Sequence, residues 1–377
     1  MTVDVRDARE LYPLTEEWAY FNTAAVGLAS RKVAEAYDAL VREWTTNGFD
    51  YMRGEAAGES ARASVAALMG VNKADLALIH SVSAAAGLVA AQLDPATDGQ
   101  NVVIGAQEYT SNHFPWRQLT SKGYEVRQVP FRGGGLEPDD VAEHVDALTR
   151  LIAFSGVQSA TGHRTDVAAI SKLARAVGAI VFLDASQMLG AVPLHDELEH
   201  VDVMAAPDHK FLLHAGRGHG YCYLSPKIRD DFIPINAGWK AAAVPVESFF
   251  GPNMELSSTA SRFDNSISWL AAVGNEAALS VFDEVGADAI YARNAELSAA
   301  LRSALTDAGW PPVPVPDGRH SPIVSVPLHD RDGPKLIAAL RERRVICSAR
   351  DGNLRLAIHF YNHEDDIEKL IRALTEI

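Results

Sequence analysis

The sequence predicts an α/β protein in which helices cover both faces of a mostly parallel sheet. Short apolar runs, among them "LALIHS", "NVVIGA", "RLIAFSG" and "AIVFLD", are typical of strands buried on both faces. Segments of helical periodicity separate several of these runs, for example "AAISKLARAVG" at 168–178. Strands that alternate with helices indicate a parallel sheet, and ligands bind such sheets at the carboxyl ends of the strands.

The first part of the chain supplies the predicted sheet. Amphipathic helices are expected at 31–46 ("RKVAEAYDALVREWTT") and 60–70 ("SARASVAALMG"). The runs "EVRQVP" and "YCYLS" complete the expected set of strands. A chain of 377 residues is long for a single hydrophobic core, which suggests a large domain with a smaller one beside it.

The pattern changes after about Leu224. Residues 235–265 have weak periodicity and many turn formers, so we expect a connecting region that lines a site. A long helical stretch is expected from Trp269 to about Ala308. Beyond it, "PIVSVPL", "VICSA" and "LRLAIHF", with helices at "GPKLIAALRERR" and "HEDDIEKLIRALTEI", predict a small α+β layer. The expected division is an N-terminal segment at 1–20 that packs with the small domain, a large domain at 21–255 and the small C-terminal domain at 256–377.

Composition and charge exclude several classes of partner. The net charge of −15 argues against a general binder of nucleic acid or of anionic membranes, although a small anionic ligand stays possible. The two cysteines, Cys222 and Cys347, predict a reduced protein, and we expect a cytoplasmic location. The acidic N-terminus does not read as a signal peptide, and no apolar run reaches membrane length.

Asp184 and Gln187 are the first candidates for chemistry. Asp184 closes the apolar run "AIVFLD", which places a carboxylate at the ligand edge of the sheet. A buried carboxylate is costly unless a cation or hydrogen-bond donors meet it. The alternative is that Asp184 caps a following helix. Gln187, three residues later, can reach the same crevice.

Lys210 is the second candidate. It follows the apolar "VDVMAAPDH" and precedes Phe211 and two leucines, whereas a lysine on the surface needs no such setting. Burial lowers the pKa of a lysine and leaves a nucleophilic amine, which forms Schiff bases with aldehydes.

Pyridoxal phosphate is the cofactor that needs both residue types. It requires a lysine for its aldehyde and an acid for its ring nitrogen. It also needs donors for a phosphate dianion, which helix N-termini supply. "IHSVSAAAG" at 79–87 offers such a terminus, with the Ser83 hydroxyl and the backbone N–H groups of Ser83 and Ala84. The same stretch also reads as an ordinary capped helix start.

"FLDASQMLGAVPL" is followed along the chain by "HK" and a glycine-bearing loop. In these motifs the sequence resembles the class V aminotransferase family of fold-type I pyridoxal-phosphate enzymes. "YFNTAAVG" at 20–27, "EYTSNHFPW" at 108–116, "RFDNS" at 262–266 and "LRLAIHFYNHEDDI" at 354–367 are similar to further family motifs in the same order. The resemblance implies a large domain with a mainly parallel seven-stranded sheet and a smaller C-terminal α+β domain.

The resemblance also implies how pyridoxal phosphate is held. Lys210 would form the Schiff base, Asp184 would pair with the pyridine nitrogen, and Gln187 would bond the phenolic oxygen. Tyr109 stands where many members have a ring-stacking histidine, and its own π-face can stack. His209 would contact the phosphate.

Further roles follow from the same resemblance. Ser83 would bind the phosphate, Arg355 would clamp the substrate carboxylate with its planar fork, and Asn22 would face the substrate. Members are usually homodimers with shared sites, so the 262–266 segment with Ser266 would reach the partner's phosphate. The expected partners are thus an amino-acid substrate and a second copy of the chain.

Several positions depart from the family pattern. Pro207 and Asp208 stand where desulfurases carry a phosphate-binding serine, and Gln158 or Ser159 stands where the family has an asparagine. Desulfurases use a cysteine on a long mobile loop, whereas Cys347 lies in the apolar "RVICSA" before a short connection. We interpret Cys347 as a buried structural residue, which disfavours a cysteine desulfurase.

Three histidines flank the lysine at intervals of five residues: His209, His214 and His219. This spacing on a glycine-rich loop does not place them on one helical face, so we predict no metal site. Arg217 in the same loop could be a second cation for an acidic substrate.

Family analogy favours β-elimination from an S-substituted cysteine, a C–S β-lyase reaction, because similar relatives with a short C-terminal loop include such lyases. Decarboxylating deamination, transamination and epimerisation of a similar amino acid stay open. A non-catalytic protein that binds pyridoxal phosphate is the alternative of another class. A Rossmann dehydrogenase is disfavoured because no G-x-G-x-x-G follows an early strand.

Overall fold

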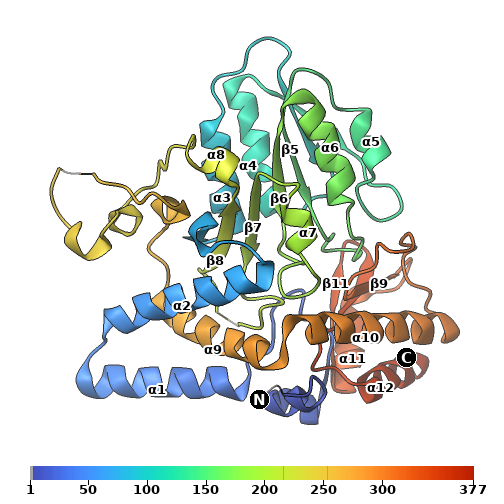
Figure 1. Ribbon diagram of the computed structural model, residues 1–377. Coiled ribbons are helices and arrows are strands. Elements are labelled where there is room, and N and C mark those ends of the chain that lie inside the picture. Colours follow the sequence, from blue (N-terminus) through green and yellow to red (C-terminus); the bar gives the residue numbers. More distant parts are fainter. Residues whose placement is uncertain (1–2, 215, 253) are drawn as a thin grey trace.

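The computed structural model describes residues 3–214, 216–252 and 254–377 (Figure 1). Its centre is a seven-stranded sheet of order β2–β8–β7–β6–β5–β3–β4. The strands are β2 (Leu76–Ile79), β3 (Asn101–Gly105), β4 (Glu125–Val129), β5 (Thr149–Ser155), β6 (Ile180–Asp184), β7 (Val203–Pro207) and β8 (Gly220–Leu224). Within this sheet β8 alone runs antiparallel to its neighbours. The prediction of an α/β protein with a mainly parallel seven-stranded sheet is confirmed.

Alternating side chains on the strands form two cores, one on each face of the sheet. In β6, Val181 and Leu183 belong to one buried cluster and Phe182 to the other. Phe182 meets Trp116 edge to face, with ring centroids 4.9 Å apart. Both faces are therefore sealed from water, which explains why the strands read as continuous apolar runs.

Helices cover both faces (Figure 1). The longer ones in the first part of the chain are α1 (Arg31–Asn47), α2 (Tyr51–Met69), α3 (Val82–Gln92) and α6 (Val167–Val177). Short helices connect them: α4 (Phe114–Arg117), α5 (Pro138–Ala142), α7 (His195–Leu198) and α8 (Pro226–Arg229). The helix α2 begins earlier than expected, because the Asp50 side chain accepts a hydrogen bond from the Met52 backbone and caps it there.

The long helical stretch after residue 268 is two helices, not one. They are α9 (Trp269–Val285) and α10 (Ala287–Asp307), and Gly286 between them has a φ of 89°. This conformation ends a helix and favours glycine. The helix α9 packs closely on α2, where a Cβ on Gly54 would lie 2.5 Å from the Trp269 side chain.

A smaller α+β layer follows. Its three-stranded antiparallel sheet has the order β11–β12–β9, formed by β11 (Ser348–Arg350), β12 (Asn353–Ala357) and β9 (Ile323–Pro327). The helices α11 (Gly333–Glu342) and α12 (Glu364–Thr375) pack on it. Cys347 lies in the core of this layer and is 6% exposed.

The N-terminal segment crosses to this layer. The strand β1 (Ala19–Tyr20) pairs in parallel with β10 (Val345–Ile346). The Arg9 guanidinium donates to the carboxylate of Asp366 in α12 at 2.7 Å. These contacts hold the start of the chain beside its end. Residues 22–27 then run from β12, where Asn22 forms a bridge with Ala357, to the loop after β7, where the Gly27 N–H bonds the His209 carbonyl. Among the described residues, no helix combines the length and the apolar character needed to cross a membrane.

Candidate active site

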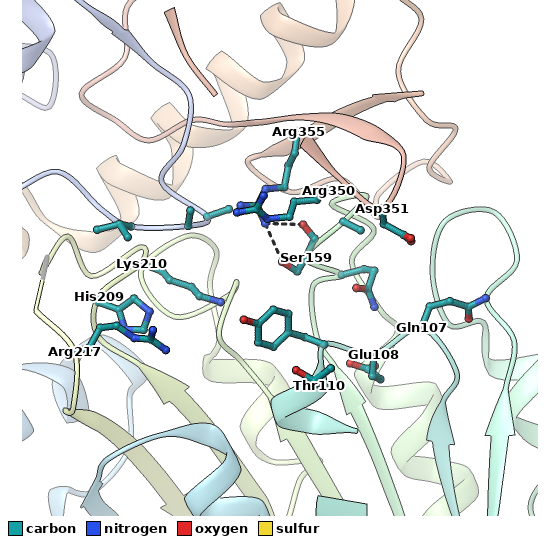
Figure 2. Close-up of a pocket in the computed structure, with 16 residues that line it drawn as sticks. Gln107, Glu108, Thr110, Ser159, His209, Lys210, Arg217, Arg350, Asp351 and Arg355 are labelled. Atoms are coloured by element: carbon teal, nitrogen blue, oxygen red, sulfur yellow. Dashed lines mark hydrogen bonds between the residues drawn. The ribbon is translucent and has the colours of Figure 1, made fainter. Parts of the chain in front are cut away.

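A cavity of about 500 Å³ lies between the carboxyl ends of the large-sheet strands and the small layer (Figure 2). Four predicted site residues line it together: Tyr109, His209, Lys210 and Arg355. The other lining residues are Ala24, Ala25, Val26, Gln107, Glu108, Thr110, Gln158, Ser159, Ala160, Arg217, Arg350 and Asp351. Contrary to expectation, none of the residues that line this cavity comes from the 235–265 region in the part of the chain that the structure describes.

Lys210 follows β7 and its amine points into the cavity (Figure 2). Loss of water around the amine, together with the charges of Arg355 and Arg217 and against that of Asp184, lowers its pKa to about 8. The Nζ atom lies 5.6 Å from the ring centroid of Tyr109, which is 56% exposed. The amine is therefore much more often neutral near pH 8 than a surface lysine is.

Asp184 ends β6 and is 3% exposed. Burial raises the pKa of its carboxyl, while the Ser186 hydrogen bond and the Lys210 charge lower it. The carboxylate accepts the Ser186 backbone N–H at 2.9 Å within a turn, and no helix begins there. The helix-cap alternative is thus excluded, and the carboxylate is free to serve a cation or a protonated group.

Gln187, Ser159 and Arg355 form a chain of hydrogen bonds. The Gln187 amide donates to the Ala24 carbonyl at 3.1 Å and to the Ser159 hydroxyl at 3.0 Å. Arg355 Nη1 donates to the Ser159 carbonyl at 3.1 Å and to its hydroxyl at 2.9 Å. Ser159, not Gln158, therefore takes the polar contacts at this edge of the cavity. It also joins the large sheet to β12 of the small layer.

Several buried polar atoms near the cavity have no hydrogen-bond partner among the described residues. They are Gln187 Oε1, Asn22 Oδ1, His209 Nδ1 and Arg355 Nε. Buried polar groups are almost always hydrogen-bonded, so this concentration indicates a site that a polar ligand completes.

Arg355 combines burial with unused donors. It is 2% exposed, and burial together with the nearby Arg350 lowers its pKa to about 10. The group therefore stays cationic at neutral pH. A planar guanidinium of this kind suits a carboxylate.

Glu108 lines the cavity floor, and its burial was not foreseen from the sequence. Burial raises the pKa of its carboxyl to about 7, against hydrogen bonds from Ser155 that lower it. The Ser155 backbone N–H donates at 2.8 Å, the Ser155 hydroxyl makes a second bond, and Asn112 donates at 3.3 Å. The signal in the sequence was the position of Glu108 shortly after β3, at the ligand edge of the sheet.

Of the residues predicted at a phosphate, His209 lines the cavity, whereas Ser83, Ala84 and Ser266 lie outside its lining. Ser81 caps α3, and its hydroxyl accepts the Ala84 N–H at 3.2 Å and contacts the Ser83 hydroxyl at 3.0 Å. Ser83 is exposed. The Ser266 carbonyl bonds His80 Nε2 at 2.8 Å, beside the same helix start. These residues form one cluster around the α3 N-terminus, and their roles stay predictions.

Behind Lys210 lies a buried polar cluster centred on Asp208. The Asp208 carboxylate bonds Nδ1 of His214 and Nδ1 of His219, each at 3.1 Å. His214 Nε2 bonds the Tyr37 hydroxyl at 2.8 Å. Burial would raise the pKa of Asp208, yet the two histidine hydrogen bonds hold it below its usual value. The two histidines thus share one oxygen of a buried carboxylate, Oδ2, and Oδ1 has no hydrogen-bond partner among the described residues. Across the described ranges, no group of three or more His, Cys, Asp or Glu side chains could hold a metal ion.

His209 lies on the cavity side of this cluster. Burial, together with the nearby cations Lys210 and Arg217 and against the Asp208 carboxylate, lowers the pKa of its imidazole to about 4. The ring is therefore neutral at physiological pH. Cys347 does not line the cavity, and burial raises the pKa of its thiol to about 12.

The chain is similar to known proteins along nearly its whole length. The family model of aminotransferase class V matches residues 19–370. A probable cysteine desulfurase of Methanothermobacter thermautotrophicus is 24% identical, over 98% of this chain and 97% of the relative. Isopenicillin N epimerase of Streptomyces clavuligerus is 28% identical, over 98% of each chain.

A solved structure shares the fold. The cystine C–S lyase C-DES, in a complex with its reaction product cysteine persulfide, superposes with a TM-score of 0.86. It is 20% identical in sequence, and the match covers 97% of this chain and 99% of that one.

Proposed function

Because the chain belongs to the class V aminotransferase family of pyridoxal-phosphate-dependent enzymes, we propose that it is a C–S β-lyase that cleaves an S-substituted cysteine. The observation that carries the proposal is the desolvated Lys210 amine, which faces a cavity that Arg355 and Tyr109 also line.

The residues present fit pyridoxal phosphate. Lys210 would hold the cofactor through its aldehyde carbon, and the buried Asp184 carboxylate would meet the protonated ring nitrogen. The unpartnered Oε1 of Gln187 and Nδ1 of His209 are polar atoms that a polar ligand would satisfy. We propose that His209, Ser83 and Ala84 lie on the phosphate side and that Ser266 reaches the phosphate held by a second copy of the chain.

Pyridoxal phosphate, when bound, supplies an electron sink for negative charge at the substrate α-carbon. Lys210 then acts as the base, because an amine of pKa about 8 can accept the α-proton near neutral pH. The tilt of the substrate decides which bond to the α-carbon lies in position to break, and Arg355 sets this tilt by holding the α-carboxylate.

β-Elimination breaks two bonds of the substrate and gives a thiol, pyruvate and ammonia. The Cα–H and Cβ–S bonds break, and the sulfur leaves as a thiol after gaining a proton. The released enamine takes up water and yields pyruvate and ammonia. In this proposal Lys210 takes the proton from carbon, and no thiol of the protein is needed.

Cys347 argues against sulfur transfer to the protein. It is buried in the core of the small layer, and its raised pKa keeps the thiol protonated. A cysteine that accepts sulfur must be a thiolate that reaches the substrate. A lyase that releases the sulfur to solvent has no such requirement.

Product analysis tests the proposal. Incubation with S-methyl-L-cysteine should give pyruvate, ammonia and methanethiol in equal amounts. Carbon dioxide with an aldehyde would instead indicate decarboxylating deamination, and a keto acid formed only with an amino acceptor would indicate transamination. Loss of optical activity without pyruvate would indicate epimerisation, which the 28% identical epimerase makes the second candidate. A protein that binds the cofactor and changes none of a panel of S-substituted cysteines would contradict catalysis.

We also propose a homodimer. The segment after β8 protrudes from the molecule (Figure 1). Several large apolar side chains on this segment and on the adjacent helices are exposed. The most exposed are Ile233, Ile235, Phe250 and Met254, at 56–97%. A patch of this kind is typical of an interaction surface.

A further inference from the structure

The cavity has the opposite charge from the protein as a whole. The chain carries a net charge of −15, but Lys210, Arg217, Arg350 and Arg355 all line the cavity. Its lining holds two acids, Glu108 and Asp351, and Glu108, with a pKa of about 7, is partly neutral at physiological pH. The cavity is therefore built for ligands that carry several negative charges.

Arg350 and Arg355 approach the cavity from neighbouring strands. They lie on β11 and β12, which pair antiparallel, and Figure 2 shows both guanidinium groups at the same wall. The charge of Arg350 is close enough to lower the pKa of Arg355. Two like charges held together repel each other unless an anion lies between them or beside them.

No carboxylate of the described chain pairs with Arg350. The one hydrogen bond of its side chain there runs from Nη1 to the Ala349 carbonyl at 2.7 Å. Asp351, its neighbour in sequence, makes no ion pair with it in the described ranges, and Figure 2 shows the Asp351 carboxylate turned away from the guanidinium. Arg350 is also exposed, so the cost of leaving it unpaired is low and a ligand can reach it.

The other three cations of the cavity already have a binding partner under the proposed function. Lys210 holds the cofactor, and Arg217 lies beside His209, on the proposed phosphate side (Figure 2). Arg355 takes the α-carboxylate of the substrate. Arg350 is then a cation at the same wall for which neither the cofactor nor the α-carboxylate accounts.

We propose that Arg350 binds a second carboxylate of the substrate, so that the preferred substrate is a cysteine whose sulfur substituent ends in a carboxylate. This inference rests on the proposed function, since it names the substrate class of the same site. Arg350 is a specificity-determining residue, and it acts by adding binding energy for one class of side chain.

A pair of substrates that differ in one charge tests whether Arg350 binds a second carboxylate. S-carboxymethyl-L-cysteine and S-carbamoylmethyl-L-cysteine have nearly the same shape, but only the first has a second carboxylate. The wild-type enzyme should favour the acid by about 10-fold or more in kcat/KM, as expected for one charge-assisted pair of about 1.4 kcal/mol or more. In Arg350→Gln the ratio should fall toward one through a higher KM for the acid, with the amide unchanged.

The control is Arg372→Gln, which removes the same charge from an exposed position on α12 outside the cavity lining. It should leave the ratio unchanged. A wild-type enzyme without preference for the acid, or an unchanged ratio in Arg350→Gln, would overturn the inference. An equal loss for both substrates would also overturn it, because that result indicates a general structural role.

Binding without turnover gives an independent readout. Calorimetric titration should show that adipate binds more tightly than its monoamide, adipamate, and that Arg350→Gln removes the difference. Adipate spaces its two carboxylates as S-carboxymethyl-L-cysteine does. If the protein takes up pyridoxal phosphate and adipate binds no better than adipamate, this inference fails alone. If no cofactor binds, the proposed function fails, and the titration still decides whether the two-cation subsite exists.

Discussion

The backbone N–H of Gly27 donates a hydrogen bond to the carbonyl oxygen of His209 at 2.9 Å. This contact pins the N-terminal segment onto the peptide that precedes Lys210. The approach is very close, because a Cβ on Gly27 would lie 2.4 Å from the Lys210 carbonyl oxygen and 2.7 Å from the Leu213 Cα. Both obstacles are backbone, and a backbone cannot move aside as a flexible side chain can.

Gly27→Ala should therefore shift the lysine loop. We expect a loss of about 2 kcal/mol in the free energy of unfolding from overpacking, and weaker binding of pyridoxal phosphate. Thermal melts and a cofactor titration measure both effects. The matched control is Gly87→Ala on α3, where a Cβ would meet nothing within 4 Å. That variant should be neutral or slightly stabilised, and equal behaviour of the two variants would contradict the account.

Asp208 should be essential to the stability of the same loop. Asp208→Ala leaves the buried Nδ1–H groups of His214 and His219 without an acceptor, at a cost of about 3–5 kcal/mol in the free energy of unfolding. Asp208→Asn keeps one acceptor oxygen and should lose less. Chemical denaturation compares them with Asp330→Ala at an exposed position, which should change stability by about 0.5 kcal/mol or less. An Asp208→Ala variant as stable as the wild type would show that the cluster does not support the fold.

The sequence predicted the strands and the ligand edge of the sheet well. "AIVFLD" is β6 except for its first residue, and Asp184 lies at the carboxyl end as expected. Apolar runs are reliable here because both faces of the sheet are buried. The break at Gly286 was missed because helical periodicity continues on both sides of it. A glycine in such a pattern is compatible with a continuous helix until its positive φ is known.

The site was predicted less completely. Lys210, His209, Tyr109 and Arg355 come together as the family resemblance implies. The Asp208 cluster was not predicted, because its histidines were weighed as metal ligands. Their contact with Asp208 depends on how the loop after β7 folds. The role of Ser159 depends on its contact with Arg355, which lies 196 residues later in the chain. Arg350 comes from the small layer and lines the cavity with residues of the large sheet. Local patterns carry no information on such contacts.

Glu108 should make stability depend on pH. Its folded pKa of about 7 lies above the ordinary 4.5, so the folded protein holds a proton that the unfolded chain releases between these values. This contribution to stability is present below pH 4.5 and is lost as the pH rises through 7. Glu108→Gln removes the titration. Between pH 4.5 and 8 the variant should therefore gain on the order of 3 kcal/mol relative to the wild type.

Denaturation at a series of pH values measures this difference. Glu143→Gln is the control, because Glu143 is exposed and its variant should follow the wild-type profile. If the difference between Glu108→Gln and the wild type does not change with pH, Glu108 titrates as an ordinary carboxyl.

Phe250 should belong to the interface of the proposed homodimer. Its side chain is 97% exposed on the protruding segment, a position that is costly for phenylalanine in a monomer. Analytical ultracentrifugation should find a dimer for the wild type and weaker association for Phe250→Asp. Ile377→Asp, at an exposed apolar position at the C-terminus, should stay dimeric. A monomeric wild type would contradict the proposal.

The central claim is that Lys210 carries pyridoxal phosphate, and borohydride reduction followed by peptide mass spectrometry tests it most directly. The protein loaded with cofactor should show a visible absorption band that borohydride erases, and the pyridoxyl mass should then lie on the peptide that contains Lys210. Lys210→Ala should keep the fold by circular dichroism and acquire no such label, whereas Lys172→Ala, at an exposed lysine, should be labelled as the wild type is. A label on another lysine, or none on the wild-type protein, would contradict the account.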